Sequence, residues 1–270
     1  MLIEGEGALG EAVIDQRANA PTFRITCGGV VLRGIDLDQT GFREALLVAG
    51  DAAVVPLIDG CRLRCSGDDA VNVGGAAAPM LRGCTLGAKK CGLRAFGAAA
   101  PVLERCVLEG CGEQGVKAME GARPTLVRCR IADSGEEGAL AMDSARLALH
   151  DCRISGCKGP AVDISGAARL ALTGGVLEAC MGGVWLWGAA RAELTGAALA
   201  GGHSHALLVD GAAVPTVRQC TIRGSVHATE GGWEGILHPS NVLSDPDQPT
   251  DFPEEEGPFR FVPDRFRRKQ

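Results

Sequence analysis

Two adjacent carboxylates are the residues whose type and spacing most directly suggest chemistry. Asp68 and Asp69 stand in the segment Ser66-Gly67-Asp68-Asp69-Ala70-Val71. Hydrolysis of a glycosidic bond requires two carboxyl groups, of which one protonates the leaving oxygen and the other attacks the sugar or activates water. Asp68 and Asp69 are therefore the candidates for catalysis, to be weighed against a purely electrostatic role.

Histidines suggest a second kind of site. His203 and His227 are 24 residues apart, close to the 22- or 23-residue period of this chain, and His205 lies between them. Two or three imidazole rings that meet can bind a metal ion. No carboxylate recurs at a matching offset, and the alternative is that all three are ordinary residues of a surface turn. We therefore expect no metal and no cofactor, with His203, His205 and His227 as the candidates if a metal binds.

A fixed internal period organises most of the chain. The form apolar-x-x-Cys-x-Leu/Ile occurs six times, and its cysteine position recurs in steps of 22 or 23 residues. The positions in this frame are Cys61, Cys84, Cys106, Cys129, Cys152, Gly175, Ala197 and Cys220. Each unit also contains an alternating segment after a glycine, such as Gly92-Leu93-Arg94-Ala95-Phe96. A period of two residues indicates β-strands.

Units of this length accommodate only short strands and turns. They are too short for a β-α-β crossover, and the consensus of leucine-rich repeats is missing. The arrangement that remains is a coil of short strands, stacked at about 4.8 Å per coil, in which equivalent strands of successive coils form parallel sheets. The abundance of glycine, 39 residues, and the absence of tyrosine fit a thin coil with many turns.

The repeated pattern Gly-apolar-x-apolar, followed by Pro-x-apolar-x-x-Cys/Asn-x-Ile, covers about residues 12–238. It resembles the repeats of the pectate-lyase-like superfamily, which contains polysaccharide lyases, hydrolases and epimerases. It is more similar to non-catalytic intracellular members, such as the β-helix region of certain F-box proteins. The resemblance implies an all-β fold, a right-handed single-stranded parallel β-helix (solenoid) of about 8–10 coils over residues 1–238. It implies little about function, because one fold hosts many chemistries.

The recurring cysteines are expected to fill the core. Stacked coils place Cys61, Cys84, Cys106, Cys129 and Cys152 in a ladder, and free cysteine behaves as a small buried hydrophobe. Parallel side chains on adjacent coils hold their Cβ atoms about 4.8 Å apart, beyond the roughly 3.5–4.5 Å of a disulfide. No Cys-x-x-Cys motif suggests a zinc site. The ladder is therefore predicted to stay reduced.

The strand after each glycine predicts a surface for binding. Charged residues at equivalent places point outward, so the neighbours Val71, Leu93, Val116, Ala139, Val162 and Val184 point inward. The outward residues form what we call the strand face: Arg94, Phe96, Lys117, Met119, Leu140, Met142, Asp163, Trp185 and Trp187. Exposed apolar patches mark interaction surfaces, and Trp and Arg suit protein partners. The rings could also stack on sugars, or be covered by loops or by the tail.

Repeat alignment weakens the case for catalysis at Asp68 and Asp69. Gly67-Asp68-Asp69 resembles the paired-aspartate motif of β-helix polygalacturonases, but the next coil has Cys91-Gly92-Leu93 in place of their Gly-His-Gly, and no Arg-x-Lys follows. The Asp-Pro-His-Asp signature of alginate epimerases is also missing. The same turn in later coils carries Lys89, Lys90, Glu113, Glu136, Glu137 and Lys158. Opposite charges on neighbouring coils favour a solvated ladder of weak ion pairs.

Charge and segment composition exclude several classes of partner. The chain has 27 basic and 33 acidic residues, a formal net charge of −6, and so lacks the basic excess that nucleic acid requires. No run of about 18 apolar residues predicts a membrane span. The first residues include Glu4 and Glu6 where a secretory signal would be basic. We expect an intracellular, cytoplasmic protein.

Residues 239–270 differ in composition from the repeats. They contain six of the 13 prolines, an acidic stretch at 245–256 and a basic one at 260–269. Such a tail is expected to be extended or disordered alone. Its phenylalanines suggest that it docks along the rod or onto another subunit: Phe252, Phe259, Phe261 and Phe266.

These patterns together favour binding over catalysis. We expect a non-enzymatic β-helix scaffold or protein-interaction module, or a structural subunit of a larger assembly, that engages a protein partner through the strand face and the tail. The alternative is a carbohydrate-binding or polysaccharide-degrading protein that stacks sugars on Trp185 and Trp187.

Overall fold

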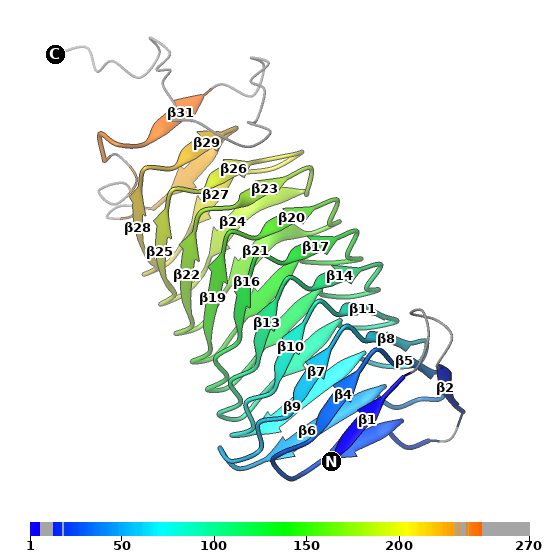
Figure 1. Cartoon of the computed structure of the whole chain (residues 1–270). Coiled ribbons are helices and arrows are strands. Elements are labelled where there is room, and N and C mark those ends of the chain that lie inside the picture. Colours follow the sequence, from blue (N-terminus) through cyan, green and yellow to red (C-terminus); the bar gives the residue numbers. More distant parts are fainter. Residues whose placement is uncertain (6–12, 18, 230–231, 233–235, 237, 245–270) are drawn as a thin grey trace, which may run out of the picture.

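The computed structural model describes residues 1–5, 13–17, 19–229, 232, 236 and 238–244. Over these residues the chain winds into a parallel β-solenoid, in which each coil contributes a strand to each of three sheets (Figure 1). The predicted all-β fold with about ten coils is confirmed. No helix among the described residues is long and apolar enough to cross a membrane.

Sheet A has ten strands, and every neighbouring pair is parallel. It runs along one flank of the rod, from the blue N-terminal strand to the orange end (Figure 1). Its strands are β1 (Leu2–Glu4), β4 (Val31–Arg33), β7 (Leu57–Asp59), β10 (Met80–Arg82), β13 (Val102–Glu104), β16 (Thr125–Val127), β19 (Arg146–His150), β22 (Arg169–Thr173), β25 (Arg191–Thr195) and β28 (Val214–Arg218).

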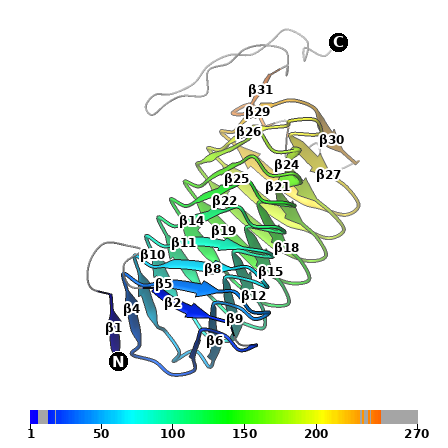
Figure 2. The same ribbon diagram turned by 90° about the vertical axis from the view of Figure 1, so that its right-hand side faces the viewer.

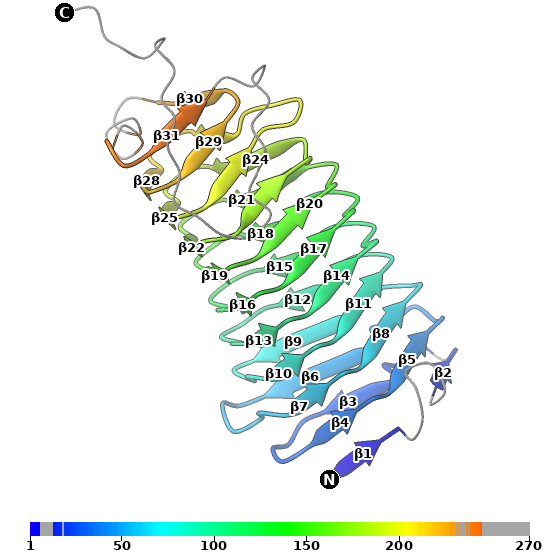
Figure 3. The ribbon, with the colours of Figure 1, turned by 45° about the horizontal axis from the view of Figure 1, so that its top comes forward.

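Sheet B has eleven strands and includes the last described strand of the chain. Its strands are β2 (Val13–Gln16), β5 (Asp36–Gln39), β8 (Arg62–Cys65), β11 (Thr85–Ala88), β14 (Val107–Glu109), β17 (Arg130–Ala132), β20 (Arg153–Ser155), β23 (Val176–Glu178), β26 (Ala198–Ala200), β29 (Thr221–Arg223) and β31 (Val242–Ser244). Because β31 pairs with β29, the solenoid continues to Ser244, past residue 238 where the sequence pattern placed its end (Figure 3). The remainder of the predicted tail, residues 245–270, lies outside the described residues.

Sheet C has ten strands and carries the predicted strand face. Figure 2 shows its strands beside those of sheet B. They are β3 (Phe23–Ile25), β6 (Leu46–Gly50), β9 (Val71–Gly75), β12 (Leu93–Ala95), β15 (Val116–Ala118), β18 (Ala139–Ala141), β21 (Pro160–Ile164), β24 (Gly182–Leu186), β27 (Leu207–Val209) and β30 (Val226–Ala228).

A single residue forms each corner between sheets A and B. This residue immediately precedes the cysteine frame position and has a left-handed backbone in every coil, with φ between 51° and 67° from Gly60 to Gln219. Glycine adopts such angles without a steric penalty, whereas other residues are uncommon there. The corner residues are Gly60, Gly83, Arg105, Arg128, Asp151, Gly174, Gly196 and Gln219. The corner thus explains part of the glycine content.

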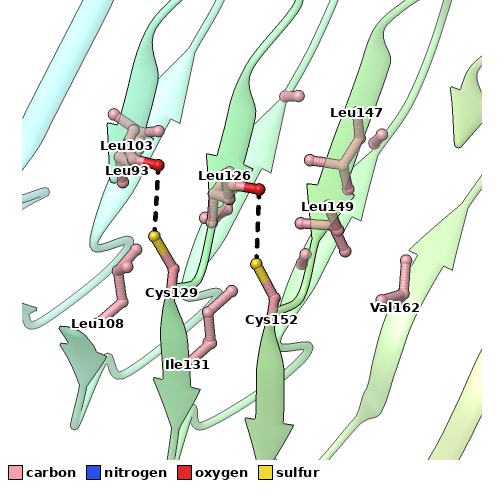
Figure 4. Close-up of a cluster of buried hydrophobic side chains, with 14 of the residues drawn as sticks. Leu93, Leu103, Leu108, Leu126, Cys129, Ile131, Leu147, Leu149, Cys152 and Val162 are labelled. Atoms are coloured by element: carbon pink, nitrogen blue, oxygen red, sulfur yellow. Dashed lines mark hydrogen bonds between the residues drawn. The ribbon is translucent and has the colours of Figure 1, made fainter. Parts of the chain in front are cut away.

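The frame cysteines lie directly after this corner and point into the rod. All of them are buried, and the predicted inward positions of sheet C, such as Val71 and Leu93, have no exposed surface. Each thiol faces the carbonyl of a sheet A strand in the preceding coil, as Cys129 Sγ does with Leu103 O (3.5 Å) and Cys152 Sγ with Leu126 O (3.6 Å) (Figure 4). All twelve cysteines are free, so the reduced ladder is confirmed.

Burial controls the reactivity of these thiols. Eleven of the twelve cysteines are buried, and Cys27 is exposed. Burial raises the pKa of Cys111 to about 11 and the pKa of Cys91 to about 12, which keeps both thiols protonated near neutral pH. Because the thiolate is the reactive form, these side chains should be inert while the solenoid is folded.

We therefore predict that iodoacetamide at pH 8 modifies one cysteine of the native chain, Cys27, and all twelve in denaturant. Intact-mass spectrometry counts the adducts, and peptide mapping locates them. The Cys27→Ser variant is the control and should give no native adduct. Rapid native labelling of Cys129 or Cys152 would contradict the packed ladder.

Candidate functional site

The register of sheet C assembles the predicted outward column. Strand pairing places Arg94 opposite Lys117, Lys117 opposite Leu140, and Leu140 opposite Asp163. The column continues through Trp185 to Leu208. One residue past the strand ends, backbone hydrogen bonds align the second column, which consists of Phe96, Met119, Met142, Ser165, Trp187 and Asp210. The predicted alignment of the strand face is therefore confirmed.

The strand face is less exposed than its composition suggested. Its aromatic and methionine side chains are half-buried, and Leu140, predicted to face solvent, retains only 9% exposure. Leu140 is flanked in register by the longer Lys117 and by Asp163, which narrows its access to water. Ser165 separates Met142 from Trp187 in the second column. The expected continuous apolar patch is thus a half-buried surface interrupted by polar side chains.

Two hydrogen bonds hold the tryptophans in place. Trp185 Nε1 donates to His205 O (3.3 Å), and Trp187 Nε1 donates to Asp163 Oδ2 (3.2 Å). The two rings meet edge to face, with centroids 6.0 Å apart and planes at 83°. Such a geometry is favourable for aromatic pairs. The pair is therefore a rigid platform whose polar edges are already occupied by the protein.

Asp163 is the titratable group most closely coupled to this platform. Its partial burial raises its pKa to about 6, while the N–H of Trp187 lowers the pKa and nearby Glu137 raises it further. Protonation therefore takes place close to physiological pH. The charge beside the tryptophans changes over the same range.

The candidate carboxylates Asp68 and Asp69 are both held in ion pairs. Asp68 Oδ1 lies 2.8 Å from Lys90 Nζ, and Asp69 Oδ2 lies 2.9 Å from Arg94 Nε. Asp69 Oδ1 accepts a hydrogen bond from the backbone N–H of Cys91 (2.9 Å). The Asp68 pair fits the predicted ladder of opposite charges. Asp69 does not, because its side chain is fully buried, and burial raises its pKa.

Asp69 begins a row of buried polar groups that crosses four coils. The thiol of Cys91 donates to Gln114 Oε1 (3.4 Å), and Gln114 Nε2 donates to Glu137 Oε2 (2.9 Å) and to Glu136. Buried polar groups are costly unless they are paired, and here each one satisfies the next. The row therefore stabilises the turn that precedes sheet C and binds Arg94 of the strand face to it.

The histidines do not form the predicted set. His227 lies opposite Leu208 in sheet C, and its ring is 5.6 Å from that of His205, not stacked on His203. The spacing of 24 residues misled because the turn before β27 displaces the alignment. His203 and His205 line a shallow pocket of about 310 Å³. Among the described residues, no three His, Cys, Asp or Glu side chains meet in a way that could hold a metal ion.

A basic surface on sheet A was not anticipated from the sequence. Four arginines on successive coils form what we call the arginine ladder: Arg123, Arg146, Arg169 and Arg191. All four side chains are exposed. The last three line a groove of about 360 Å³, to which Ala148, Ala171 and Glu193 also contribute. A signal existed in the sequence, since Ala-Arg recurs at 122–123, 145–146, 168–169 and 190–191 with the period of the repeat.

The raised pKa of Asp163 predicts an unusual dependence of stability on pH. A carboxyl group whose pKa is higher in the folded state favours folding when protonated, so its contribution is present below about pH 4 and is lost as pH rises through about 6. Asp163→Asn stays neutral and keeps an acceptor for Trp187. Above pH 6 the variant should be more stable than the wild type by about 1–2 kcal/mol, a figure reduced for solvent screening. Near pH 4 the two should agree.

Urea unfolding at several pH values between 4 and 7.5 measures this difference. Asp51→Asn, which removes an exposed carboxylate, is the control and should show no comparable pH-dependent gain. A constant difference between Asp163→Asn and the wild type across the range would contradict a raised pKa.

Repulsion along the arginine ladder predicts a stabilising substitution. Like charges on neighbouring strands destabilise a sheet, so Arg169→Gln should raise the free energy of unfolding by about 0.2–1 kcal/mol at low salt. The gain should shrink as salt screens the repulsion. Arg62→Gln is the contrasting control, because it removes the partner of buried Asp36 (2.9 Å) and should cost about 3 kcal/mol. Urea unfolding at 20 and 500 mM NaCl tests both, and a loss of stability in Arg169→Gln would refute the repulsion.

Comparison with known proteins places this fold in a family. No curated protein matches the sequence. The crystal structure of pectate lyase Pel9A is similar, with a TM-score of 0.53 and 11% identity over 82% of this chain and 67% of that chain. At this identity the likeness shows the fold alone. A family model described as the right handed beta helix region matches residues 44–199, more than half of the chain. The chain therefore belongs to the right-handed β-helix family, as its repeats predicted.

Proposed function

We propose that this protein is a non-enzymatic β-helix that serves as a scaffold or protein-interaction module. The observation that carries the proposal is the state of Asp69, which is fully buried between Arg94 and the backbone of Cys91. An acid or base in catalysis must come within hydrogen-bonding distance of the substrate. Asp69 has both oxygens engaged by the protein and no exposed surface, so its role is to hold Arg94 and the turn.

The strand face supports binding of a partner. Arg94 and Trp187 are held by acidic partners, and Trp185 is fixed by a backbone carbonyl. Side chains that are already ordered lose little entropy on association. Arg, Trp and Met are also enriched in protein interfaces. A rigid row of these side chains along several coils is suited to an extended contact with another protein.

One observation favours carbohydrate binding as a second candidate. Trp185 and Trp187 form a ring platform with Asp163 beside them, and Lys117 lies two coils below Asp163 in the same column. Aromatic rings next to polar side chains can stack on sugars. The likeness to a pectate lyase adds only that the fold is compatible with this use.

Assays on polysaccharides separate scaffold from enzyme. Full-length protein is incubated with neutral and acidic polysaccharides, with and without Ca²⁺, and release of reducing ends and of unsaturated products is followed. We expect wild type and Asp69→Asn to give the same background. Turnover by the wild type that falls at least tenfold in Asp69→Asn would contradict the proposal.

Binding assays then identify which partner the tryptophans serve. We expect cross-linked capture by the wild type to retain proteins that are lost from the Trp185→Ala/Trp187→Ala variant and kept by Phe42→Ala. Phe42 is a matched control, since it is 77% exposed and lies outside the strand face. Circular dichroism verifies the fold of each variant. Tryptophan fluorescence that responds to an oligosaccharide, with no difference in protein capture, would favour the carbohydrate candidate.

A further inference from the structure

The arginine ladder is the strongest charged feature on the described surface that the proposed function does not use. Strand pairing places Arg146 opposite Arg169 and Arg169 opposite Arg191. The backbone N–H of Arg146 bonds to Ala122 O, which sets Arg123 one coil below. Within the described part of the chain, none of the four guanidinium groups makes a side-chain hydrogen bond or an ion pair. Most other sheet A and sheet B arginines in the lower coils do, including Arg33, Arg62 and Arg82.

The placement of these charges is costly without a ligand. Neighbouring rungs of the ladder are about 4.8 Å apart along the rod, well inside the roughly 8 Å Debye length at physiological salt. The chain as a whole has a net charge of −6, so unpaired basic residues on successive coils are not a consequence of composition. An arrangement that opposes folding and recurs in register is expected where a bound anion offsets the repulsion.

The groove beside the ladder fits an extended acidic segment. Ala148 and Ala171 lie two residues after Arg146 and Arg169 on the same outward face, so small side chains form its floor. Guanidinium groups bind carboxylates through paired hydrogen bonds. A row of four such groups can bind a peptide that presents several carboxylates within a few residues.

We infer that the arginine ladder binds an acidic peptide segment and that residues 251–256 of this chain, Asp-Phe-Pro-Glu-Glu-Glu, are its occupant. Four carboxylates in six residues match four guanidinium groups. The described chain ends at Ser244 in β31, which pairs with β29, and β29 pairs with β26, the strand that follows Arg191. The anchor is thus two coils, about 10 Å, from the end of the ladder.

The connecting chain is long enough for this contact. The twelve residues 245–256 span up to about 40 Å when extended, which covers two coils and the distance around the rod. A tethered segment also has an effective concentration in the millimolar range, so weak individual ion pairs suffice. Acidic residues of the segment then offset the charge of the ladder in the same molecule.

Peptide competition tests the inference with full-length chains. A fluorescent peptide of residues 245–258 is titrated with the wild type and with a tail-neutralised variant, Glu254→Gln/Glu255→Gln/Glu256→Gln, and anisotropy is measured at 50 and 300 mM NaCl. We expect the tail-neutralised chain to bind the peptide at least tenfold more tightly than the wild type, whose own segment competes. Binding should weaken at high salt.

Substitutions in the ladder assign the site. Added to the tail-neutralised chain, Arg146→Gln/Arg169→Gln should weaken peptide binding at least tenfold. The control pair Arg24→Gln/Arg128→Gln removes the same charge from exposed arginines that do not line the groove and should leave affinity within twofold. Both pairs are on the surface, and circular dichroism verifies their fold.

Each other outcome overturns the inference. Equal binding by the wild type and the tail-neutralised chain would show that the chain's own segment is not the occupant. Equal loss in the ladder pair and the control pair would show a nonspecific effect of charge. If the tail-neutralised chain ignores the peptide but binds oligo(dT) or a heparin oligosaccharide through the ladder, the site belongs to a different polyanion.

Discussion

The left-handed residue at the corner between sheets A and B is the constraint from which the rest of the solenoid follows. It turns the chain within one residue and brings the next side chain, usually cysteine, under the corner. A larger side chain at that place would meet the sheet A strand of the preceding coil, whose carbonyl lies 3.4–3.6 Å from the sulfur. Corner and cysteine together therefore fix the length and register of each coil.

Once the register is fixed, every surface residue is placed directly above its counterpart in the previous coil. This makes the exterior of the rod a set of columns, and electrostatics acts along them. On sheet B, Arg62 lies opposite Asp36 and Arg64 opposite Asp38, and each pair is within 3.1 Å. On sheet A, the same geometry stacks arginine on arginine. Identical stacking thus stabilises one surface and destabilises another, and the difference depends only on which residues recur.

The period of the sequence was sufficient to predict the fold, the cysteine ladder and the alignment of the strand face, because all three depend on spacing alone. It was not sufficient for burial. Asp69 was expected on a solvated ladder, but it is enclosed because Arg94 on the next coil folds back onto it. Side-chain direction of this kind depends on the lengths of neighbouring residues, which a period does not contain.

The histidines and the arginine ladder show two other limits. His227 was assigned to the wrong neighbour because one turn differs in length, and a change of even one or two residues moves every later position of that turn. The arginines recur with the same period as the cysteines, yet attention to outward residues was confined to the strand after each glycine. An equal search of all three sheets would have found them, since a column of one charge is visible as a repeated residue type.

The two candidate surfaces differ in a physical property that bears on their use. On the strand face, Arg94 and Asp163 are each engaged by a neighbour, so a ligand there gains from shape and apolar contact more than from charge. On the arginine ladder, the guanidinium groups are exposed and mutually repelling, so a ligand gains from charge neutralisation. Binding on the ladder is therefore expected to depend strongly on salt, whereas binding on the strand face is not. One rod can hold both contacts at once, because the two surfaces belong to different sheets.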